Sequence, residues 1–199
     1  HLYGSPLPVE SVKAVISLIR DDKGDWRLPP AMRRSKPPLM NELPMGLPGK
    51  LYRSVMPGSR MFDPEDQVMN LYAQNGIQTV VVLNSELDMR EHALRDPRER
   101  YAQAGLDQIH APVPDFSAPS AGTWNAALQQ VAALLRAGTI VAVHCHAGIG
   151  RTGMFCACLA QEVLGLSPQE SITWVRGCIP GAVETEFQKQ FVLEYPLTR

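Results

Sequence analysis

Apolar and polar residues follow one another along this chain in blocks that predict strands alternating with helices. The continuous apolar runs at 79–83 and 139–143 are typical of strands buried on both faces of a sheet. Between residues 124 and 135 the apolar positions recur at helical spacing, which predicts an amphipathic helix. The small and apolar residues at 151–164 predict a second, buried helix.

Start and stop signals give further bounds. Asp63-Pro64 is typical of a helix start, and Asn75-Gly76 is typical of its end. Residues 167–170 have the capping-box pattern that opens another helix. A proline at position 97 interrupts an otherwise helical stretch at 84–105. The remaining expected elements are strands at 51–54 and 108–113 and a last helix at 184–195.

This order of elements predicts an α/β fold, with a central, mostly parallel sheet of about four to five strands and helices on both faces. In such sheets, ligands bind beyond the carboxyl ends of the strands. Residues 1–49 differ, because prolines at 29, 30, 37, 38, 44 and 48 disfavour a regular element. We expect a proline-rich arm at 1–49 that packs on a catalytic domain at 50–199. A docking segment for a partner is the alternative for the arm.

Composition narrows the class of protein. A chain of 199 residues that is 45% hydrophobic suits one domain with a sizeable core. Its net charge of −1 gives no general electrostatic case for nucleic acid or for an anionic membrane. Four cysteines without framework spacing predict free thiols in a reducing compartment, and therefore the cytoplasm. The chain begins at His1 rather than Met, which indicates a truncated or processed start and leaves a removed signal peptide open.

The stretch at 144–153 carries the most specific chemical signal. An apolar run leads into Cys145, five residues separate this cysteine from Arg151, and a helix is expected next. A strand, a tight loop and a helix start can direct backbone N–H groups and the helix dipole at a tetrahedral anion. Glycines let the backbone approach that anion closely. The predicted phosphate-binding residues are His146, Ala147, Gly148, Ile149, Gly150 and Arg151.

Two side chains of this loop are placed to do chemistry on the anion. The planar fork of Arg151 pairs with two phosphate oxygens at once. The same field favours a thiolate on Cys145, which makes it a nucleophile at neutral pH. We expect Thr152 to donate its hydroxyl to the sulfur, which helps the sulfur leave, and His144 to hold the loop through its ring N–H. Cys156, Cys158 and Cys178 are interpreted as core thiols, with a resolving role toward the nucleophile left open.

The Cys-x5-Arg-Thr pattern, preceded by histidine, resembles the active-site signature of cysteine-based protein tyrosine phosphatases, in their small atypical dual-specificity branch. Residues 112–116 resemble the loop that carries the general-acid aspartate of that family, which is Asp115 here. Residues 180–188 resemble the final segment of the family, whose glutamine orients the hydrolytic water and corresponds to Gln188. The resemblance covers roughly residues 50 to 196.

This resemblance implies hydrolysis of phosphomonoesters through a cysteinyl-phosphate intermediate, with Asp115 as the acid and then the base. The implied partner is a phosphorylated protein, with phosphotyrosine favoured and phosphoserine or phosphothreonine also accepted. A counterpart of the Tyr-bearing loop of the large tyrosine-specific enzymes is not evident, which favours looser specificity. Glu184 and Glu186 are rival acids, although a surface position in the first turn of a helix explains them more simply.

Other classes are considered beside this one. They are an inositol-phosphate or phosphoinositide phosphatase, an RNA 5′-phosphatase, an inactive phosphate-binding module and a sulfur transferase. The absence of lysines in the loop, the neutral charge and the presence of Asp115 weigh against them. We expect no cofactor and no metal, since adjacent strand residues such as His144, Cys145 and His146 cannot easily converge on one ion. We expect a monomer without a nucleic-acid or membrane partner.

Overall fold

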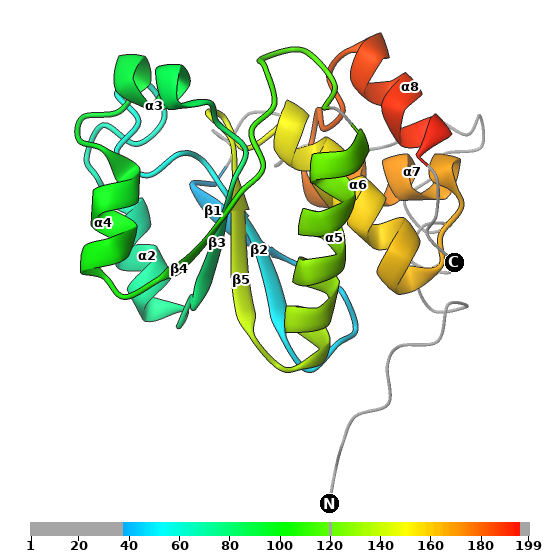
Figure 1. Ribbon diagram of the computed structural model, residues 1–199, viewed down its shortest axis with the longest axis horizontal. Helices are drawn as coiled ribbons and strands as arrows, with labels where there is room; N and C mark the ends of the chain where they lie inside the picture. The colour runs from blue at the N-terminus through cyan, green and yellow to red at the C-terminus, as the bar shows by residue number, and fades with distance from the viewer. Residues whose placement is uncertain (1–37, 120, 196–199) are drawn as a thin grey trace, which may run out of the picture. The chain divides into compact units, whose positions relative to one another are not determined.

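The sheet lies at the centre of the part of the chain that the computed structural model describes, residues 38–119 and 121–195 (Figure 1). Its strand order is β1-β2-β5-β3-β4, with β1 antiparallel to β2 and the other neighbours parallel. The predicted α/β fold with a mostly parallel sheet is therefore confirmed. The strands are β1 (Met40–Leu43), β2 (Lys50–Ser54), β3 (Thr79–Val82), β4 (Asp107–His110) and β5 (Ile140–His144).

Helices cover both faces of the sheet, as the sequence predicts. Figure 1 shows α2, α3 and α4 on one side and α5, α6, α7 and α8 on the other. Their bounds are α2 (Val68–Gln74), α3 (Glu86–His92), α4 (Pro97–Gln103), α5 (Ala121–Arg136), α6 (Gly150–Leu164), α7 (Pro168–Cys178) and α8 (Glu186–Glu194). Within the described residues, none of these helices is long and apolar enough to cross a membrane.

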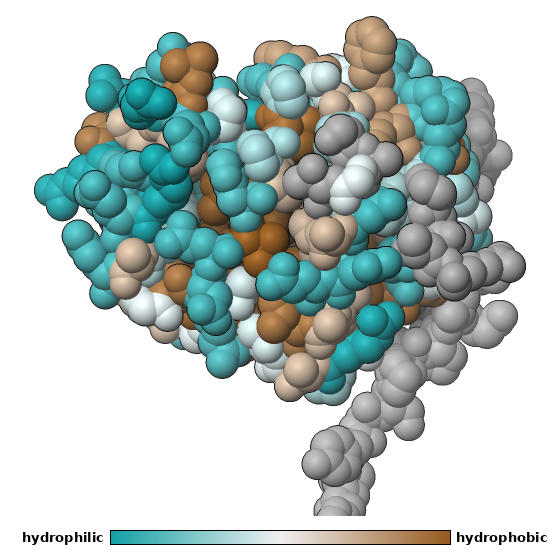
Figure 2. Space-filling model, in the orientation of Figure 1, coloured by the Kyte–Doolittle hydropathy of each residue, from teal (hydrophilic) through white to brown (hydrophobic). Residues whose placement is uncertain are grey.

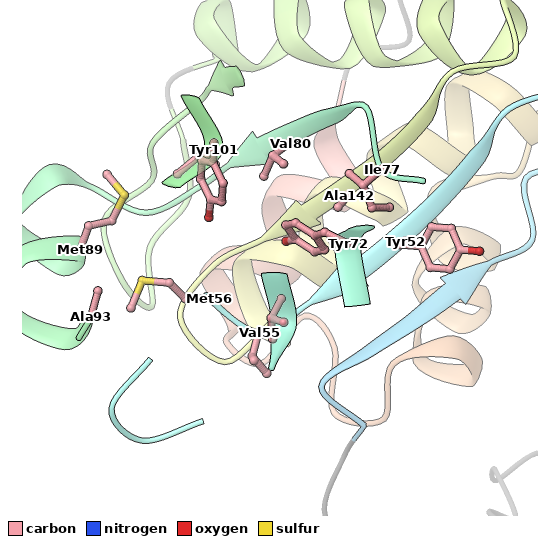
Figure 3. Close-up of a cluster of buried hydrophobic side chains, with 12 residues drawn as sticks. Tyr52, Val55, Met56, Tyr72, Ile77, Val80, Met89, Ala93, Tyr101 and Ala142 are labelled. Atoms are coloured by element: carbon pink, nitrogen blue, oxygen red, sulfur yellow. The ribbon is translucent and has the colours of Figure 1, made fainter. Parts of the chain in front are cut away.

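The core follows from the alternation of side chains along the buried strands. All four residues of β3 are buried, because strands flank it on both edges and helices cover both faces. On the α5 side, Trp124 packs edge-on against Phe155, with ring centroids 5.2 Å apart. On the α2 side, a cluster of buried hydrophobic side chains fills the space beneath the helices (Figure 3). This cluster includes Tyr52, Val55, Met56, Val68, Tyr72, Ile77, Val80, Val82, Met89, Ala93, Tyr101 and Ala142.

The register of the parallel strands places the predicted chemistry at one edge. His144 at the end of β5 pairs with Ser54 at the end of β2 and with Val82 at the end of β3. The connections that follow β3, β4 and β5 therefore leave the sheet at the same edge. Cys145 and Asp115, which are 30 positions apart in sequence, lie on two of these connections.

One predicted helix start is wrong. Helix α2 begins at Val68 rather than at Asp63, and Asp63 is buried outside the helix. Its carboxylate accepts hydrogen bonds from the N–H groups of Gly58 at 2.8 Å and Gln67 at 2.7 Å. Asp63 therefore organises the turn before the helix, because Asp66 adopts a left-handed backbone (φ 57°) that a helix does not allow.

The predicted arm at 1–49 includes part of the sheet. Residues 40–43 form the edge strand β1, which pairs with β2 despite the nearby prolines. Proline lacks an N–H donor but is tolerated beside an edge strand, so the composition did not exclude this pairing. Residues 1–37 of the predicted arm lie outside the described residues.

Candidate active site

The loop at Cys145–Arg151, called the signature loop below, connects β5 to α6. Gly148 has a left-handed backbone (φ 70°), which favours glycine. A Cβ atom on Gly148 would collide with the carbonyl oxygen of Ser54 and lie 3.2 Å from Nη1 of Arg53. The N–H of Met56 donates to the carbonyl of His146 at 3.1 Å. The end of β2 therefore supports the loop from below, and only glycine fits at the contact.

His144 lies directly beneath the loop and is buried. Its Nδ1 is 3.3 Å from the carbonyl oxygen of Cys145, and its Nε2 is 2.7 Å from the hydroxyl of Tyr101. Burial lowers the pKa of His144 to about 4, and the positive charges of Arg151 and His110 add smaller effects in the same direction. The hydrogen bond to the Cys145 carbonyl acts the other way and raises the pKa. The ring is thus neutral at neutral pH, and it contacts the loop as expected from the sequence.

Arg151 is almost completely buried and is held from two neighbouring connections. Its Nη1 lies 2.6 Å from Oδ2 of Asp88 and donates to the carbonyl of Val113 at 3.1 Å. Its Nη2 lies 3.1 Å from Oδ1 of Asp115. These contacts fix the plane of the guanidinium, which matters because a planar fork binds phosphate only in the correct orientation.

Asp88 is a site residue that the sequence alone did not indicate. It belongs to the capping box at the start of α3, in which Ser85 accepts its N–H and its carboxylate accepts the N–H of Ser85. Burial raises the pKa of Asp88, but the hydrogen bond and charge of Arg151 outweigh burial, so the pKa lies below its usual range. A capping-box pattern was visible in the sequence, but its contact with Arg151 depends on the tertiary fold.

Asp115 is more exposed than Asp88. Its side chain is 48% exposed, against 20% for Asp88, although both carboxylates contact the same guanidinium. The next residue, Phe116, has a left-handed backbone (φ 55°) and donates its N–H to Oδ1 of Asp115 at 3.1 Å. The predicted general acid is therefore beside the signature loop and at the surface, where a leaving group can reach it.

The side chain of His146 packs against α3 and the turn before α2. Its ring stacks on His92, with centroids 4.3 Å apart, and its Nε2 lies 3.1 Å from the hydroxyl of Ser59. Burial first, and then the charges of His92 and Arg151, lower the pKa of His146. At neutral pH this residue therefore adds little positive charge to the loop. Ala147 and Ile149 are partly exposed beside it.

Gln188 lies in the first turn of α8 and is buried. Its Oε1 accepts the N–H of Glu184 at 2.8 Å, and it forms a capping box with Thr185. A Cβ atom on Gly150 would lie 3.1 Å from its amide. The amide is thus next to the signature loop, but its oxygen is used by the backbone. Its predicted role with the hydrolytic water stays a prediction.

Arg53 is a second buried guanidinium near the signature loop, and its role was not predicted. It is 1% exposed, and its Nε donates to the side chain of Asn41 on β1. Burial lowers the pKa of Arg53, while the neighbouring thiols of Cys145 and Cys156 raise it. The sequence signal was an arginine within an otherwise core-forming strand.

Two buried polar atoms at the junction of the signature loop and α6 have no hydrogen-bond partner among the described residues. They are Nε of Arg151 and the hydroxyl of Thr152. The Thr152–Cys145 hydrogen bond is therefore a prediction for the reaction and not a contact of this structure. Unpaired buried polar groups are costly and rare, and at a ligand site they are the donors that a ligand uses. Within residues 38–119 and 121–195, no cluster of three or more His, Cys, Asp or Glu residues is arranged to hold a metal ion.

Of the remaining cysteines, Cys156 and Cys158 lie in the core, as expected, whereas Cys178 at the end of α7 is only partly buried. Burial raises the pKa of Cys156 and Cys158 on α6, and it raises the pKa of Cys178 to about 12. These three side chains are therefore protonated thiols at neutral pH and poor nucleophiles.

Comparison with known proteins agrees with this geometry. The model of the family described as "Polymorphic toxin system, DSP-PTPase phosphatase" matches residues 56–162, which include Asp88, Asp115 and the whole signature loop. The chain belongs to this family. The match ends before Glu184 and Gln188, so these two residues take no role from it.

Curated relatives of this DSP-PTPase chain are themselves named as phosphatases or as a cyclin-dependent kinase inhibitor. Cyclin-dependent kinase inhibitor 3 of Rattus norvegicus is 28% identical over 123 residues, which is 61% of this chain and 58% of that protein. Tyrosine-protein phosphatase cdc-14 of Caenorhabditis elegans is 30% identical over 118 residues, or 59% of this chain and 15% of that protein. The chain therefore spans less than two thirds of these two curated relatives.

Solved structures share the fold of the DSP-PTPase chain. The crystal structure of Tk-PTP in its active form has 30% sequence identity and a TM-score of 0.61, and the match covers 73% of this chain and 90% of that one. A structure of kinase associated phosphatase has a TM-score of 0.71 and covers 81% of this chain and 96% of that one. At 20% identity, this second likeness shows the fold alone.

Proposed function

We propose that this chain hydrolyses phosphomonoesters of proteins through a phosphocysteine at Cys145, with phosphotyrosine as the preferred substrate. The observation that carries the proposal is the convergence of three groups. Cys145 begins the signature loop, Arg151 closes it, and Asp115 lies 3.1 Å from the Arg151 guanidinium. A nucleophile, an anion-binding group and a surface acid are the groups that stepwise phosphoryl transfer requires.

The reaction has two steps. In the first, the thiolate of Cys145 attacks phosphorus, the bond to the leaving oxygen breaks, and Asp115 gives that oxygen its proton. In the second, Asp115 takes a proton from water, the water oxygen attacks phosphorus, and the sulfur leaves as a thiolate. Arg151 and the backbone N–H groups of the loop stabilise the charge on the phosphoryl oxygens in both steps. Thr152, whose hydroxyl has no partner among the described residues, donates to the departing sulfur.

Charge around the loop favours singly phosphorylated substrates. Asp88 and Asp115 both contact Arg151, and the ring of His146 is held mostly neutral. A head group with several phosphates would place further negative charge near these carboxylates, which costs free energy. A phosphorylated protein is therefore a better fit to this loop than inositol polyphosphates or RNA ends.

Exposed aromatic side chains support a peptide substrate. Phe116 is 61% exposed and Phe187 is 76% exposed. They belong to neighbouring segments, because the hydroxyl of Thr185 donates to the carbonyl of Phe116 at 3.3 Å. Aromatic side chains at the edge of a site bind aromatic and apolar peptide groups well. On the face that Figure 2 shows, hydrophilic residues cover most of the surface and hydrophobic residues are visible in separate patches.

A substrate panel tests the proposal. Phosphotyrosine and phosphothreonine peptides, a phosphoinositide and a 5′-triphosphorylated RNA are offered to the wild-type chain and to Cys145→Ser. We expect fastest release of phosphate from the phosphotyrosine peptide and none from any substrate with Cys145→Ser. Activity that persists in Cys145→Ser would reject the mechanism, and a preference for the phosphoinositide or RNA would reject the substrate class.

We also propose that the chain works as a monomer in the reducing environment of the cytoplasm. The four free cysteines support a reducing setting, since Cys145 must stay reduced to act as a nucleophile. Light scattering at micromolar concentration tests whether the chain is a monomer. Labelling of Cys145 by a thiol reagent in intact cells tests whether this cysteine stays reduced there.

A further inference from the structure

Glu184 lies in a short segment whose backbone is fixed by several contacts. The segment at 182–185 crosses the start of α6, where a Cβ atom on Gly153 would lie 2.5 Å from the Cβ of Ala182. Arg176 on α7 donates to the carbonyls of Ala182 at 3.0 Å and Val183 at 3.1 Å. Val183 has a left-handed backbone (φ 58°), which is unfavourable for a β-branched residue. Such strain persists only where surrounding contacts fix it, and it often marks a functional position.

This segment directs the carboxylate of Glu184 at the signature loop. The carboxylate lies against the backbone of Gly150, whose N–H lowers the pKa of Glu184. Oε2 of Glu184 also fills the place where a Cβ atom of Gly150 would lie. The backbone N–H of Glu184 is in turn bound by Gln188 at 2.8 Å. Glu184 is therefore exposed at the surface, as the sequence indicated, but it lies before α8, which begins at Glu186, and not in the first turn of that helix.

The carboxylate of Glu184 lies next to the backbone N–H of Gly150, which a bound phosphate would also use. Gly150 is the first residue of α6, so its N–H has no partner within the helix and is available to an anion. A phosphate in the signature loop would bind this same N–H. A phosphate dianion and the Glu184 carboxylate would then lie side by side, and two anions at that distance repel strongly.

The surroundings make Glu184 easier to protonate than an ordinary glutamate. Burial and the charge of Asp115 raise the pKa of Glu184, against the effects of the Gly150 N–H and Arg151, which lower it. A protonated Glu184 is uncharged and can donate a hydrogen bond to a phosphate oxygen. The ionisable groups that act on it are Asp115 on the loop after β4 and Arg151 on α6, and Arg176 on α7 binds the carbonyls of the two residues before it.

We propose that Glu184 competes with phosphate for the Gly150 N–H and so controls phosphate binding there, with the phosphoryl group entering as Glu184 takes up a proton from solvent or swings away. The inference rests on the proposed function, because it assumes that the signature loop binds a phosphoryl group. It makes Glu184 a positioning residue that sets the affinity of the loop for anions and the pH dependence of that affinity.

Sulfate is the probe that tests this inference, because its charge is constant across the relevant pH range. The measurements use Cys145→Ser, which removes the charge of the thiolate, and compare it with Cys145→Ser/Glu184→Gln. Calorimetry in buffers of different ionisation enthalpy gives both the affinity and the protons taken up. We expect Cys145→Ser to lose sulfate affinity as the pH rises above the usual glutamate pKa of about 4.3. The Glu184→Gln variant should bind sulfate about tenfold more tightly at pH 7 and with little proton uptake.

Two further variants make the result specific. Glu186→Gln removes a carboxylate that is 89% exposed at the start of α8, and it should leave sulfate affinity and proton uptake unchanged. Glu184→Asp keeps the charge but shortens the side chain by one methylene, and it should relieve only part of the competition. Its result also decides the question if Glu184→Gln proves unstable. Sulfate affinity and proton uptake that do not change when glutamine replaces Glu184 would overturn the inference.

A result that rejects the role of Glu184 can be told apart from one that rejects the proposed function. Sulfate binding that ignores Glu184, together with phosphatase turnover by the wild-type chain, rejects only the role of Glu184. Absence of turnover and of sulfate binding rejects both, because the loop would then not be an anion site.

Discussion

Two aspartates contact Arg151 from neighbouring connections, and they differ in what surrounds them. Asp88 follows β3 and is fixed by the capping box of α3, with a carboxylate that is 20% exposed. Asp115 follows β4 on an irregular loop, and its carboxylate is 48% exposed. The same pairing with arginine therefore produces a fixed support in one case and an accessible acid in the other. Contact with Arg151 alone does not identify the catalytic residue, whereas access to the leaving group does.

Replacing the accessible aspartate is expected to have the largest effect. Asp115→Asn should lower kcat about 10²- to 10⁴-fold, because the leaving oxygen departs without a proton. Binding of vanadate should survive, since Arg151 and the backbone of the loop remain. Initial rates of phosphate release and the dissociation constant of vanadate, measured for both proteins at the same pH, check this. Glu186→Gln is the matched control. Equal turnover by Asp115→Asn and wild type would remove Asp115 from the mechanism.

Replacing the shared partner should affect both aspartates together. Arg151→Lys keeps a positive charge but not the planar fork that bonds Asp88, Asp115 and two phosphate oxygens. We expect kcat/KM to fall about 10²- to 10³-fold. Arg98→Lys, at an exposed ion pair with Asp96, serves as the control. An Arg151→Lys variant with nearly normal kcat/KM would show that charge alone is sufficient at this position.

Replacing the supporting aspartate, Asp88, should lower activity less than replacing Asp115 does, and it should destabilise the fold more. Asp88→Asn should lower kcat/KM about tenfold, because Arg151 loses one fixed partner but keeps Val113 and Asp115. The pKa of Asp88 is lower in the folded chain than its unfolded value of about 3.9. Its contribution to stability is therefore complete above that value and is lost as the pH falls through the folded pKa.

Urea unfolding at pH 7 and pH 3 measures this dependence. Asp88→Asn should destabilise the chain more at pH 7 than at pH 3. Asp96→Asn is the matched control, since Asp96 also caps a helix and the hydrogen bond of Arg98 likewise lowers its pKa, but it is remote from Arg151. Asp96→Asn should change stability without changing kcat/KM. A loss of activity as large as that of Asp115→Asn would make Asp88 more than a support.

The smallest expected effect concerns the cap that fixes Asp88. Ser85→Ala removes the hydroxyl that accepts the Asp88 N–H and should destabilise the chain by about 1 kcal/mol. Ser167→Ala removes the corresponding capping hydroxyl of α7 and should cost a similar amount. Only Ser85→Ala should also lower kcat/KM, by a few-fold. If both variants kept full activity, the capping box would not be needed to position Arg151.

The local pattern of the sequence determined much of the fold. The buried strands β3 and β5, the helix interruption at Asp96 and the capping box at Ser167 were predicted because each depends on residues close together in the chain. The start of α2 was not predicted, because the Asp63 carboxylate bonds Gly58 and Val68 instead of simply capping a helix. The edge strand β1 was missed because its pairing with β2 is a tertiary contact.

By itself, the sequence determined the chemistry of the loop: five residues separate Cys145 from Arg151 between a strand and a helix, and that spacing depends only on the local chain. The tertiary structure alone decided which distant side chains meet the loop. Asp88, Arg53 and Glu184 reach it from the connection after β3, from β2 and from the segment before α8. The physical reason is that pairing of parallel strands and packing of helices bring these positions to one edge of the sheet. Nothing in the local sequence of Asp88 or Arg53 records that they lie near Arg151, and Glu184 was indicated only as a rival acid and not as a neighbour of Gly150.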